Sequence, residues 1–240
     1  MSEPAGEGTQ RPRGRHRRSR GEAGGPPARS RWSFLRRGTA FFVIAIVGSV
    51  LVKAFLVQSF FIPSASMEPT LHGCPSCVND RVLVNKLITR TGGVHRGDIV
   101  VFHDPGGWMA HFSKPAAAPQ SRVSEVLALV GLAPSNIDLV KRVIGVGGDT
   151  VEGRGGKVYV NGAALVEPYL FPGDSPTEID FKVTVPVDTL WVMGDHRSDS
   201  DDSRYQQQKP GKGFVPVKDV IGNAFAIIWP LDRIGALGAS

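Results

Sequence analysis

The sequence predicts a mostly β protein, in which an antiparallel-sheet domain follows a single N-terminal transmembrane helix. Three observations support this fold class. An apolar run begins at residue 39, directly after an arginine-rich tail. Beyond residue 60 the chain consists of short apolar runs separated by Gly, Pro and Asp, as is typical of β-rich domains. Asn161-Gly162 between Val160 and Ala163 is a strong β-hairpin signal. We therefore expect three regions, namely a tail over 1–37, an anchor over 38–57 and a β domain over 58–240.

The tail accounts for the basic character of the chain. The 240 residues carry a formal net charge of +6, but residues 1–37 contain ten Arg and three Glu and carry +7, which leaves −1 for the remainder. A domain without a basic surface argues against nucleic-acid binding. The tail is poor in large apolar residues, so we expect it to be disordered. Its arginines predict that it stays cytoplasmic, and anionic lipid is the one partner that the charge itself implies.

The apolar run predicts a membrane anchor. Thr39–Val52 is uninterrupted, and if Lys53 snorkels the run extends over 39–57, about 28 Å of helix against a hydrocarbon core of about 30 Å. A buried core helix, a cleaved secretory signal and a twin-arginine signal at Arg36-Arg37 are the alternatives. We expect one uncleaved span in the bacterial cell membrane, with the domain outside. Ile221–Leu231 is too short for a second span and predicts a buried terminal strand.

Seven strands are expected in the domain, together with one long insertion over 104–138. The strands are Arg81–Asn85, Asp98–Phe102, Leu139–Val146, Lys157–Val160, Phe181–Val185, Thr189–Met193 and Val220–Ile228. Within the insertion, Ser121–Leu132 has helical spacing. Trp108, Met109 and Phe112 are either a small packed cluster or a surface that enters the bilayer interface, where Trp is favoured.

The two cysteines form the motif Cys74-Pro-Ser-Cys77. In an extracytoplasmic domain a local disulfide is the simplest interpretation. Half of a zinc site, completed by His72 and a distant histidine, or a redox pair of the thioredoxin type are the alternatives. A membrane-anchored redox or metal-binding module built on these cysteines is therefore the alternative function. Loss of function on Cys74→Ala but not on Ser66→Ala would favour it.

Three clusters carry the candidate chemistry. The first, residues 60–71, follows the apolar run and contains Ser64 and Ser66. The second, residues 139–149, places Lys141 and Arg142 in an apolar β run, so that one of them must point into the packed side or a cleft. A buried lysine tends to lose its proton, and lowering its pKa from about 10.4 to about 7–8 requires roughly 3.5–4.5 kcal/mol. Such a lysine can act as a general base. A lysine paired with an acidic residue at the end of a strand would, however, give the same local sequence pattern.

The third cluster spans Met193–Arg204 and is dense in Asp and Ser. A calcium loop is one interpretation, but the spacing of an EF-hand is absent and two arginines lie inside the run. Arginines among carboxylates favour a loop held by ion pairs. His103, His111 and His196 would permit a Ser–His mechanism, but none of them lies in a triad motif.

Taken in order, these clusters resemble bacterial type I signal peptidase. The resemblance rests on Ser66-Met67 with Pro69-Thr70-Leu71, on Arg96-Gly97-Asp98 with the apolar run to Phe102, on Lys141-Arg142 and on Gly194-Asp195 through Arg204. It covers residues 36–231. It implies a membrane-bound serine endopeptidase that removes signal peptides from exported preproteins and needs no cofactor or metal. A self-cleaving repressor would use the same dyad, but it requires a DNA-binding domain that the tail does not supply.

The resemblance also implies roles for individual residues. Ser66 matches the nucleophile and Lys141 the general base, while Ser64 and the Ser66 N–H match the oxyanion donors. Ser200 matches a residue that orients the lysine. The ion-paired support of the loop corresponds to Asp195, Asp202 and Arg204. The pockets that accept small residues at −1 and −3 of the preprotein correspond to Phe60, Ile62, Leu71, Leu139 and Val140. The bilayer and the secretion translocon are the implied partners.

Several features depart from the family pattern. His196 stands where Asn is usual, and Gly147 replaces a common Pro; both lie outside the dyad. Ala65 stands where Gly is frequent, beside the matched nucleophile. The segment around Cys74 and Cys77 occupies a place where the family usually has a shorter turn, so the resemblance assigns it no role.

Overall fold

The computed structural model describes residues 37–49, 56–74, 77–87, 93–109 and 138–238. The chain divides into two compact units, Met1–Ala45 and Ile46–Ser240. A helix occupies residues 37–49, and its large apolar side chains are exposed, from 48% for Ile46 to 75% for Phe41. The predicted disordered tail lies outside the described residues, as do 50–55 of the predicted anchor.

Among the described residues, no helix has both the length and the apolar character needed to cross a membrane. The last residue of the predicted anchor, Val57, is not helical and instead begins the first strand. The prediction of a helix to residue 57 is wrong at that position, because Val57–Phe61 pairs along its whole length with Arg81–Asn85.

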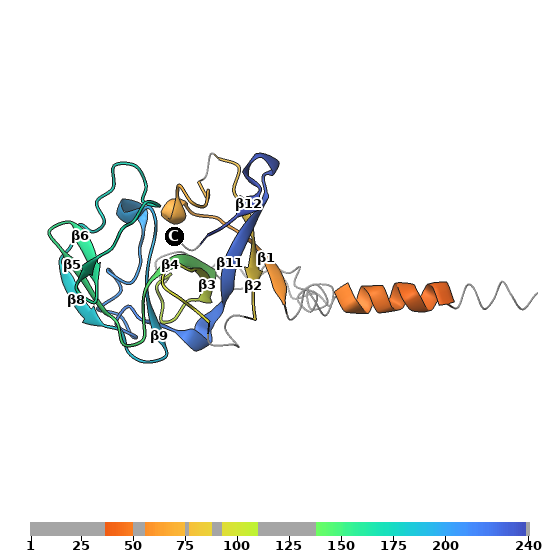
Figure 1. Ribbon diagram of the computed structural model, residues 1–240, viewed down its shortest axis with the longest axis horizontal. Helices are drawn as coiled ribbons and strands as arrows, with labels where there is room; N and C mark the ends of the chain where they lie inside the picture. Colours follow the sequence, from red (N-terminus) through yellow and green to blue (C-terminus); the bar gives the residue numbers. More distant parts are fainter. Residues whose placement is uncertain (1–36, 50–55, 75–76, 88–92, 110–137, 239–240) are drawn as a thin grey trace, which may run out of the picture. The chain divides into compact units, whose positions relative to one another are not determined.

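The main sheet of the second unit has eight strands, and every pairing in it is antiparallel (Figure 1). Its order is β1 (Val57–Phe61), β2 (Arg81–Asn85), β11 (Val220–Trp229), β3 (Ile99–His103), β4 (Asp138–Val146), β9 (Thr189–Met193) and β10 (Val215–Pro216), with β12 (Gly235–Ala236) paired to β11. Four 3-10 helices lie between strands, η1 (Ala65–Met67), η2 (Arg197–Asp199), η3 (Val217–Asp219) and η4 (Leu231–Arg233).

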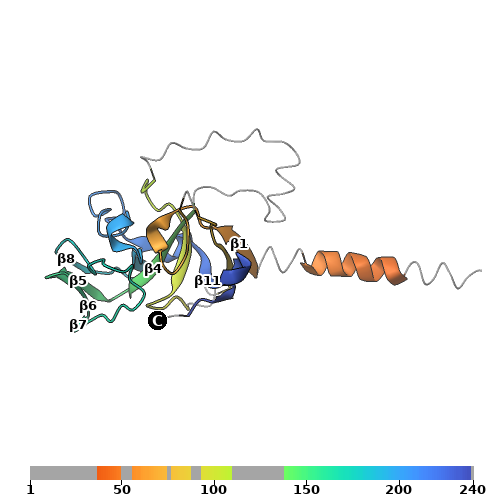
Figure 2. The same ribbon diagram turned by 90° about the horizontal axis from the view of Figure 1, so that it is seen from above.

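A second, smaller sheet has the order β7 (Ala163–Ala164), β6 (Lys157–Val160), β5 (Thr150–Arg154) and β8 (Phe181–Thr184). It lies away from β1 and β11 in both views (Figures 1 and 2). The predicted hairpin at Asn161-Gly162 is confirmed, since both residues have positive φ, 54° and 82°, between β6 and β7. Such values suit the two-residue turn that joins tightly paired strands.

Side-chain alternation distributes the core over both faces of the main sheet. On β3, Ile99 and Val101 pack into one cluster of buried residues, while Val100 and Phe102 pack into another. Consequently β3 is apolar at four successive positions rather than alternating, as expected of a strand with both faces covered. A third cluster joins the two sheets and includes Trp191 of β9.

All seven predicted strands are present, with ends that differ by no more than one residue. Of the apolar segment Ile221–Leu231, the residues up to Trp229 lie in β11, while Leu231 begins η4. The prediction of a buried terminal strand is therefore only partly confirmed, because Phe225, Ile228 and Trp229 are exposed and β12 follows. The strands β1, β5, β10 and β12 were not predicted, and β7 was implied only by the predicted hairpin. β5 was missed because its residues, Thr150–Arg154, contain Glu and Gly and show no clear apolar alternation.

The described part of the insertion ends at Met109. Trp108 is 1% exposed and packs edge-on against Phe102, with ring centroids 5.8 Å apart. The interpretation as a packed cluster is thus confirmed for Trp108, and the bilayer interpretation is wrong for it. One carboxylate fixes this turn, because Asp104 accepts hydrogen bonds from the amides of residues 106–109. Phe112 and the predicted helix Ser121–Leu132 lie outside the described residues.

Candidate active site

The site is centred on Ser66, in the short helix η1 that follows β1. Ser66 is 7% exposed, and its hydroxyl Oγ lies 2.5 Å from Nζ of Lys141. The two residues are 75 positions apart in sequence. Lys141 lies near the middle of β4, between β3 and β9, where it pairs with Val100 and is 4% exposed. A rigid central strand therefore holds the amine against the serine.

Burial changes the protonation of this lysine. Removal from water lowers the pKa of Lys141 below its ordinary value, because the ammonium loses its hydration. The carboxylates of Asp202, Asp201, Asp195 and Asp199 act in the opposite direction and raise the pKa, but they do not overcome the effect of burial. A lysine in this environment is a stronger candidate for a base at neutral pH than an exposed one.

Ser64 lies beside the serine–lysine pair. Its hydroxyl Oγ is 3.3 Å from Ser66 Oγ, and its side chain lines the same cavity. The main chain of Ser66 is held from the other side, because the amide of His196 donates to the Ser66 carbonyl at 3.2 Å. Gly194 passes so close that a Cβ placed on it would lie 2.4 Å from that carbonyl oxygen, so a larger residue would displace the nucleophile.

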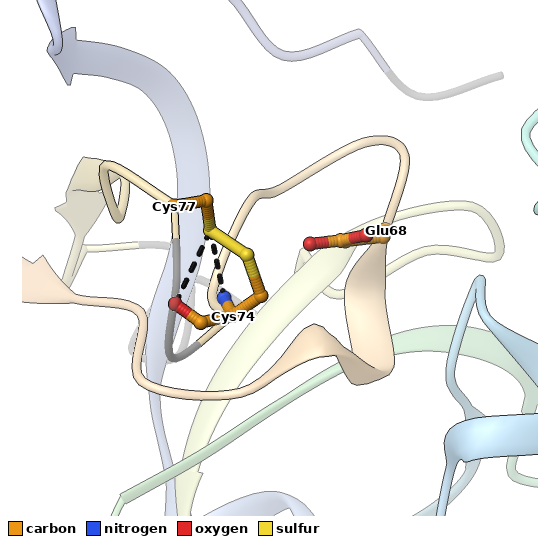
Figure 3. Close-up of side chains that lie close together, drawn as sticks. All are labelled: Glu68, Cys74 and Cys77. Atoms are coloured by element: carbon orange, nitrogen blue, oxygen red, sulfur yellow. Dashed lines mark hydrogen bonds between the residues drawn. A yellow bond between two sulfur atoms is a disulfide. The ribbon is translucent and has the colours of Figure 1, made fainter.

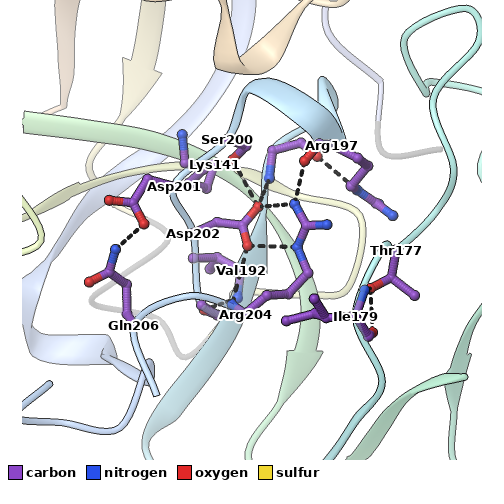
Figure 4. Close-up of polar contacts among 12 residues, drawn as sticks. Lys141, Thr177, Ile179, Val192, Arg197, Ser200, Asp201, Asp202, Arg204 and Gln206 are labelled. Atoms are coloured by element: carbon purple, nitrogen blue, oxygen red, sulfur yellow. Dashed lines mark hydrogen bonds and ion pairs between the residues drawn. The ribbon is translucent and has the colours of Figure 1, made fainter. Parts of the chain in front are cut away.

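The third cluster forms a buried polar network around Asp202 (Figure 4). The Asp202 carboxylate pairs with Arg204 and accepts hydrogen bonds from the Gly194 amide at 3.0 Å and the Ser200 hydroxyl at 2.8 Å. Burial by itself would raise the pKa of Asp202, but these donors together lower it. Because the single proton of the Ser200 hydroxyl points to Asp202, Ser200 could orient Lys141 only as an acceptor.

Arg142, next to the lysine, is buried as well. Its guanidinium binds Asp195 through Nε at 2.8 Å and Nη2 at 2.6 Å, and it lies over the ring of Tyr169. Thr70 donates to the same carboxylate at 2.5 Å, which ties the segment after Ser66 to the third cluster. The sequence required only one of Lys141 and Arg142 to be buried, whereas both are, because β4 is covered on both faces.

A cavity of about 740 Å³ opens onto Ser66 and Lys141. Three of the residues predicted for the substrate pockets line it, namely Ile62, Leu139 and Val140. The other two do not. Leu71 is fully buried in a core cluster, and Phe60 packs against that cluster. The assignment of these two residues to the pocket surface is therefore not supported by the geometry, because they contribute to the core beneath it.

The cavity is also lined by residues to which the sequence assigned no place in a pocket. They come from η1 and the segment just before it, from the turn after β3, from the start of β4, and from the third cluster and the residue that follows it. They are Pro63, Ala65, Met67, Met109, Asp138, Ser198, Asp199, Asp201 and Tyr205. Asp138 directly precedes the predicted strand at Leu139, and that adjacency is the one signal that could have identified it.

Neither described histidine of the Ser–His alternative contacts the Ser66 hydroxyl. His103 pairs with Asp138 at 2.9 Å, and the ring of His196 stacks on Phe171. His111 lies outside the described residues.

Cys74 and Cys77 are joined in a disulfide. With Glu68 they bring three potential ligand atoms within 4.8 Å of one another, but zinc is bound by thiolates, so the disulfide form does not fit the zinc alternative.

Known proteins are similar in sequence to most of this chain. Residues 35–229 match the family described as "Signal peptidase, peptidase S26". A probable signal peptidase I of Mycobacterium leprae is 40% identical over 82% of this chain and 77% of its own length. Signal peptidase I of Mycobacterium tuberculosis is 39% identical over 88% of this chain and 78% of its own. A solved structure of signal peptidase I from Enterococcus faecalis is 28% identical in sequence. The match covers 54% of this chain and 95% of the solved chain, with a TM-score of 0.35.

Proposed function

The chain belongs to the signal peptidase family, peptidase S26, and we propose that it acts through a dyad of Ser66 and Lys141. As a signal peptidase I it is a serine peptidase that cleaves signal peptides from exported preproteins. The single observation that carries the proposed dyad is the distance of 2.5 Å between Lys141 Nζ and Ser66 Oγ, with both side chains buried.

The proposed reaction begins with neutral Lys141, which takes the proton of the Ser66 hydroxyl as Oγ attacks the scissile carbonyl carbon. The resulting oxyanion accepts hydrogen bonds from the Ser66 N–H and the Ser64 hydroxyl. Lys141 then returns its proton to the leaving amine of the mature protein, and the C–N bond breaks. Water attacks the acyl-enzyme with Lys141 again as base, which releases the signal peptide and restores Ser66.

The polar network of the third cluster supports this dyad without taking part in the chemistry. Asp202, paired with Arg204, fixes Ser200 and the Gly194 amide. Asp195 is held by Arg142 from β4. We therefore assign Asp195, Asp202 and Arg204 to the positioning of the loop.

The shape of the cavity supports a preference for small residues at −1 and −3 of the preprotein. Ile62, Leu139 and Val140 bring apolar side chains to its surface close to Ser66. An apolar wall discriminates by size, because each additional methylene must be accommodated against packed side chains.

We further propose that the apolar segment from residue 38 up to the start of β1 anchors the enzyme in the membrane, with the tail in the cytoplasm and the catalytic domain outside. The exposed apolar side chains of residues 41–47 support an apolar environment for this segment. In that case the nucleophile works near the bilayer surface and beside the translocon, where the signal helix of the substrate presents its cleavage site.

The proposal is tested by preprotein cleavage in detergent or liposomes with wild type, Ser66→Ala and Lys141→Ala. Each substitution should lower kcat by at least about a thousandfold, because the two groups act as a unit. Circular dichroism should show that both variants remain folded. Substantial cleavage by either folded variant would rule out the dyad.

A further inference from the structure

The disulfide between Cys74 and Cys77 has no part in the reaction just described, yet it lies in a segment that contacts the active site. We call residues 72–80 the cysteine loop; its described residues are 72–74 and 77–80 (Figure 3). The loop follows η1, which carries Ser66, and leads into β2.

The two ends of the cysteine loop are fixed. The His72 amide donates to the Asp80 carboxylate at 2.8 Å, and the Asp80 amide donates to the His72 carbonyl at 2.9 Å. Arg233 binds the same carboxylate through Nε at 2.9 Å and Nη2 at 3.0 Å. Breaking the disulfide would therefore affect the residues between His72 and Asp80, and would leave these two end residues in place.

The first residue inside these ends is Gly73, and it packs directly on Ser64. A Cβ placed on Gly73 would lie 2.2 Å from the Ser64 carbonyl oxygen and 2.6 Å from the Ser64 nitrogen. No side-chain atom can be accommodated at such distances, so the Gly73 and Ser64 backbones are in close contact, and a shift of Gly73 toward Ser64 would have to displace Ser64. Ser64 Oγ is in turn 3.3 Å from the Ser66 hydroxyl. Gly73, which precedes Cys74, is thus connected to the Ser66 hydroxyl through contacts with one intervening residue, Ser64.

The surroundings of the sulfurs suit both oxidation states. The Cys74 amide donates to Cys77 Sγ at 2.9 Å. The same sulfur is 3.3 Å from the Cys74 carbonyl oxygen and 3.6 Å from Asn79 Oδ1, both of which are acceptors. A disulfide sulfur has no proton to donate, but the thiol of reduced Cys77 would find both acceptors in place. Reduction would therefore leave the Cys77 thiol with acceptors already in place.

The disulfide is also accessible. A cavity of about 300 Å³ is lined by both cysteines together with Phe61, Arg81 and Trp229. On the other side, a Glu68 oxygen lies within 4.8 Å of both sulfurs. A nearby carboxylate disfavours the thiolate form of a reduced cysteine.

We propose that Cys74–Cys77 is a reversible thiol–disulfide exchange site, and that its oxidation state sets the position of Ser64 through Gly73. The inference rests on the proposed roles of Ser64 and Ser66. The co-reactant is an extracytoplasmic dithiol. One of its thiolates attacks a cysteine sulfur and breaks the S–S bond, and its second thiol resolves the mixed disulfide. Two electrons and two protons pass to the cysteines, and the dithiol becomes a disulfide. Reduction frees the cysteine loop and slows acylation.

The test equilibrates full-length wild-type enzyme in detergent with mixtures of reduced and oxidised dithiothreitol. Maleimide labelling measures the fraction of reduced cysteines, and initial rates are measured on a preprotein that lacks cysteine. We expect kcat to fall by about tenfold in step with reduction, which is less than the 10²–10³-fold cost of losing an oxyanion donor outright. The proposal is overturned if labelling reaches completion at constant kcat, or if the native enzyme cannot be reduced.

Three variants make the coupling specific. Cys74→Ser/Cys77→Ser should show the rate of reduced wild type at every redox potential, and Gly73→Ala should be slow in both states. Ser64→Ala should be slow and indifferent to redox potential, because the group that transmits the change is gone. A persistent response in the double serine variant would place the sensor elsewhere. Cleavage by Ser66→Ala would instead refute the proposed function, so the two failures are distinguishable.

Discussion

At the residue scale, the proposed chemistry depends on one lysine that is buried against one serine. A lysine in water at neutral pH is almost entirely protonated and cannot accept a proton. Burial of Lys141 lowers its pKa, and the aspartates of the third cluster limit how far it falls. The site therefore balances two opposing effects on a single amine, and the sum of them determines the pH at which the enzyme becomes active.

This balance predicts the pH profile. Since Lys141 must be deprotonated to act, kcat/KM should rise with pH through an inflection below the ordinary pKa of lysine. Asp199→Asn removes one of the carboxylates that raise this pKa, so the inflection should move to lower pH by about a few tenths of a unit. Asp232→Asn, an exposed carboxylate that is not among those acting on Lys141, is the matched control. A shift to higher pH in Asp199→Asn would contradict the electrostatic account.

At the scale of elements, β4 determines where the charged groups lie. It is covered on both faces, so Lys141 and Arg142, which alternate along it, are both removed from water. Removing a charged group from water is unfavourable. Lys141 responds by losing its proton more readily, whereas Arg142 keeps its charge and binds the carboxylate of Asp195. The same strand thus carries a reactive lysine and a permanently charged arginine at neighbouring positions.

Breaking the Arg142–Asp195 pair should be costly. The side chains are 1% and 0% exposed, so Asp195→Asn would leave a buried guanidinium without its counter-charge. We expect the free energy of unfolding to fall by about 3–5 kcal/mol, measured by urea denaturation. Lys182→Met breaks an ion pair with Glu152 whose lysine is 67% exposed, and it should change stability by less than about 1 kcal/mol. Equal effects of the two substitutions would mean that burial does not determine how much an ion pair contributes to the free energy of unfolding.

The β6–β7 turn provides a separate test of backbone conformation. Gly162 has a φ of 82° and open space around its missing Cβ, so Gly162→Ala introduces strain but no clash. It should destabilise the protein by about 1–2 kcal/mol. Gly235→Ala, at a glycine without positive φ and with its nearest neighbour 3.9 Å away, should stay within about 0.5 kcal/mol. Thermal unfolding of both variants distinguishes conformational strain from a general effect of adding a methyl group.

At the scale of the whole molecule, the proposed anchor and the catalytic domain have separate roles in binding the substrate. The anchor confines the enzyme to the surface at which the substrate is also held, and the cavity selects the cleavage site. Removal of residues 1–55 should therefore lower kcat/KM on a membrane-embedded preprotein by about 10²–10⁴-fold and leave the cleavage of a soluble peptide almost unchanged. Equal losses on both substrates, measured side by side, would show that the segment supports the fold rather than tethering the enzyme.

The sequence by itself determined most of the strands and the hairpin, and it indicated the residues of the proposed dyad. Apolar alternation and turn residues are local signals, so Arg81–Asn85 and Thr189–Met193 could be recognised without any knowledge of their neighbours. Ser66 and Lys141 could be named because short motifs around them resemble those of a known family. The same resemblance implied an ion-paired loop at Asp195, Asp202 and Arg204, and Asp202 does pair with Arg204.

Only the tertiary structure decided which side chains face the cavity and which lie beneath it. Val140 lines the cavity while Leu71, equally apolar, is buried in the core, because the way β4 and the segment around η1 pack against each other, and not the local pattern, sets which side chain faces the cavity. The packing of Gly73 on Ser64 is likewise invisible in sequence, since it depends on a loop folding back over nine residues. Contacts of this kind arise from the path of the whole chain, and they connect the cysteines to the site where the chemistry takes place.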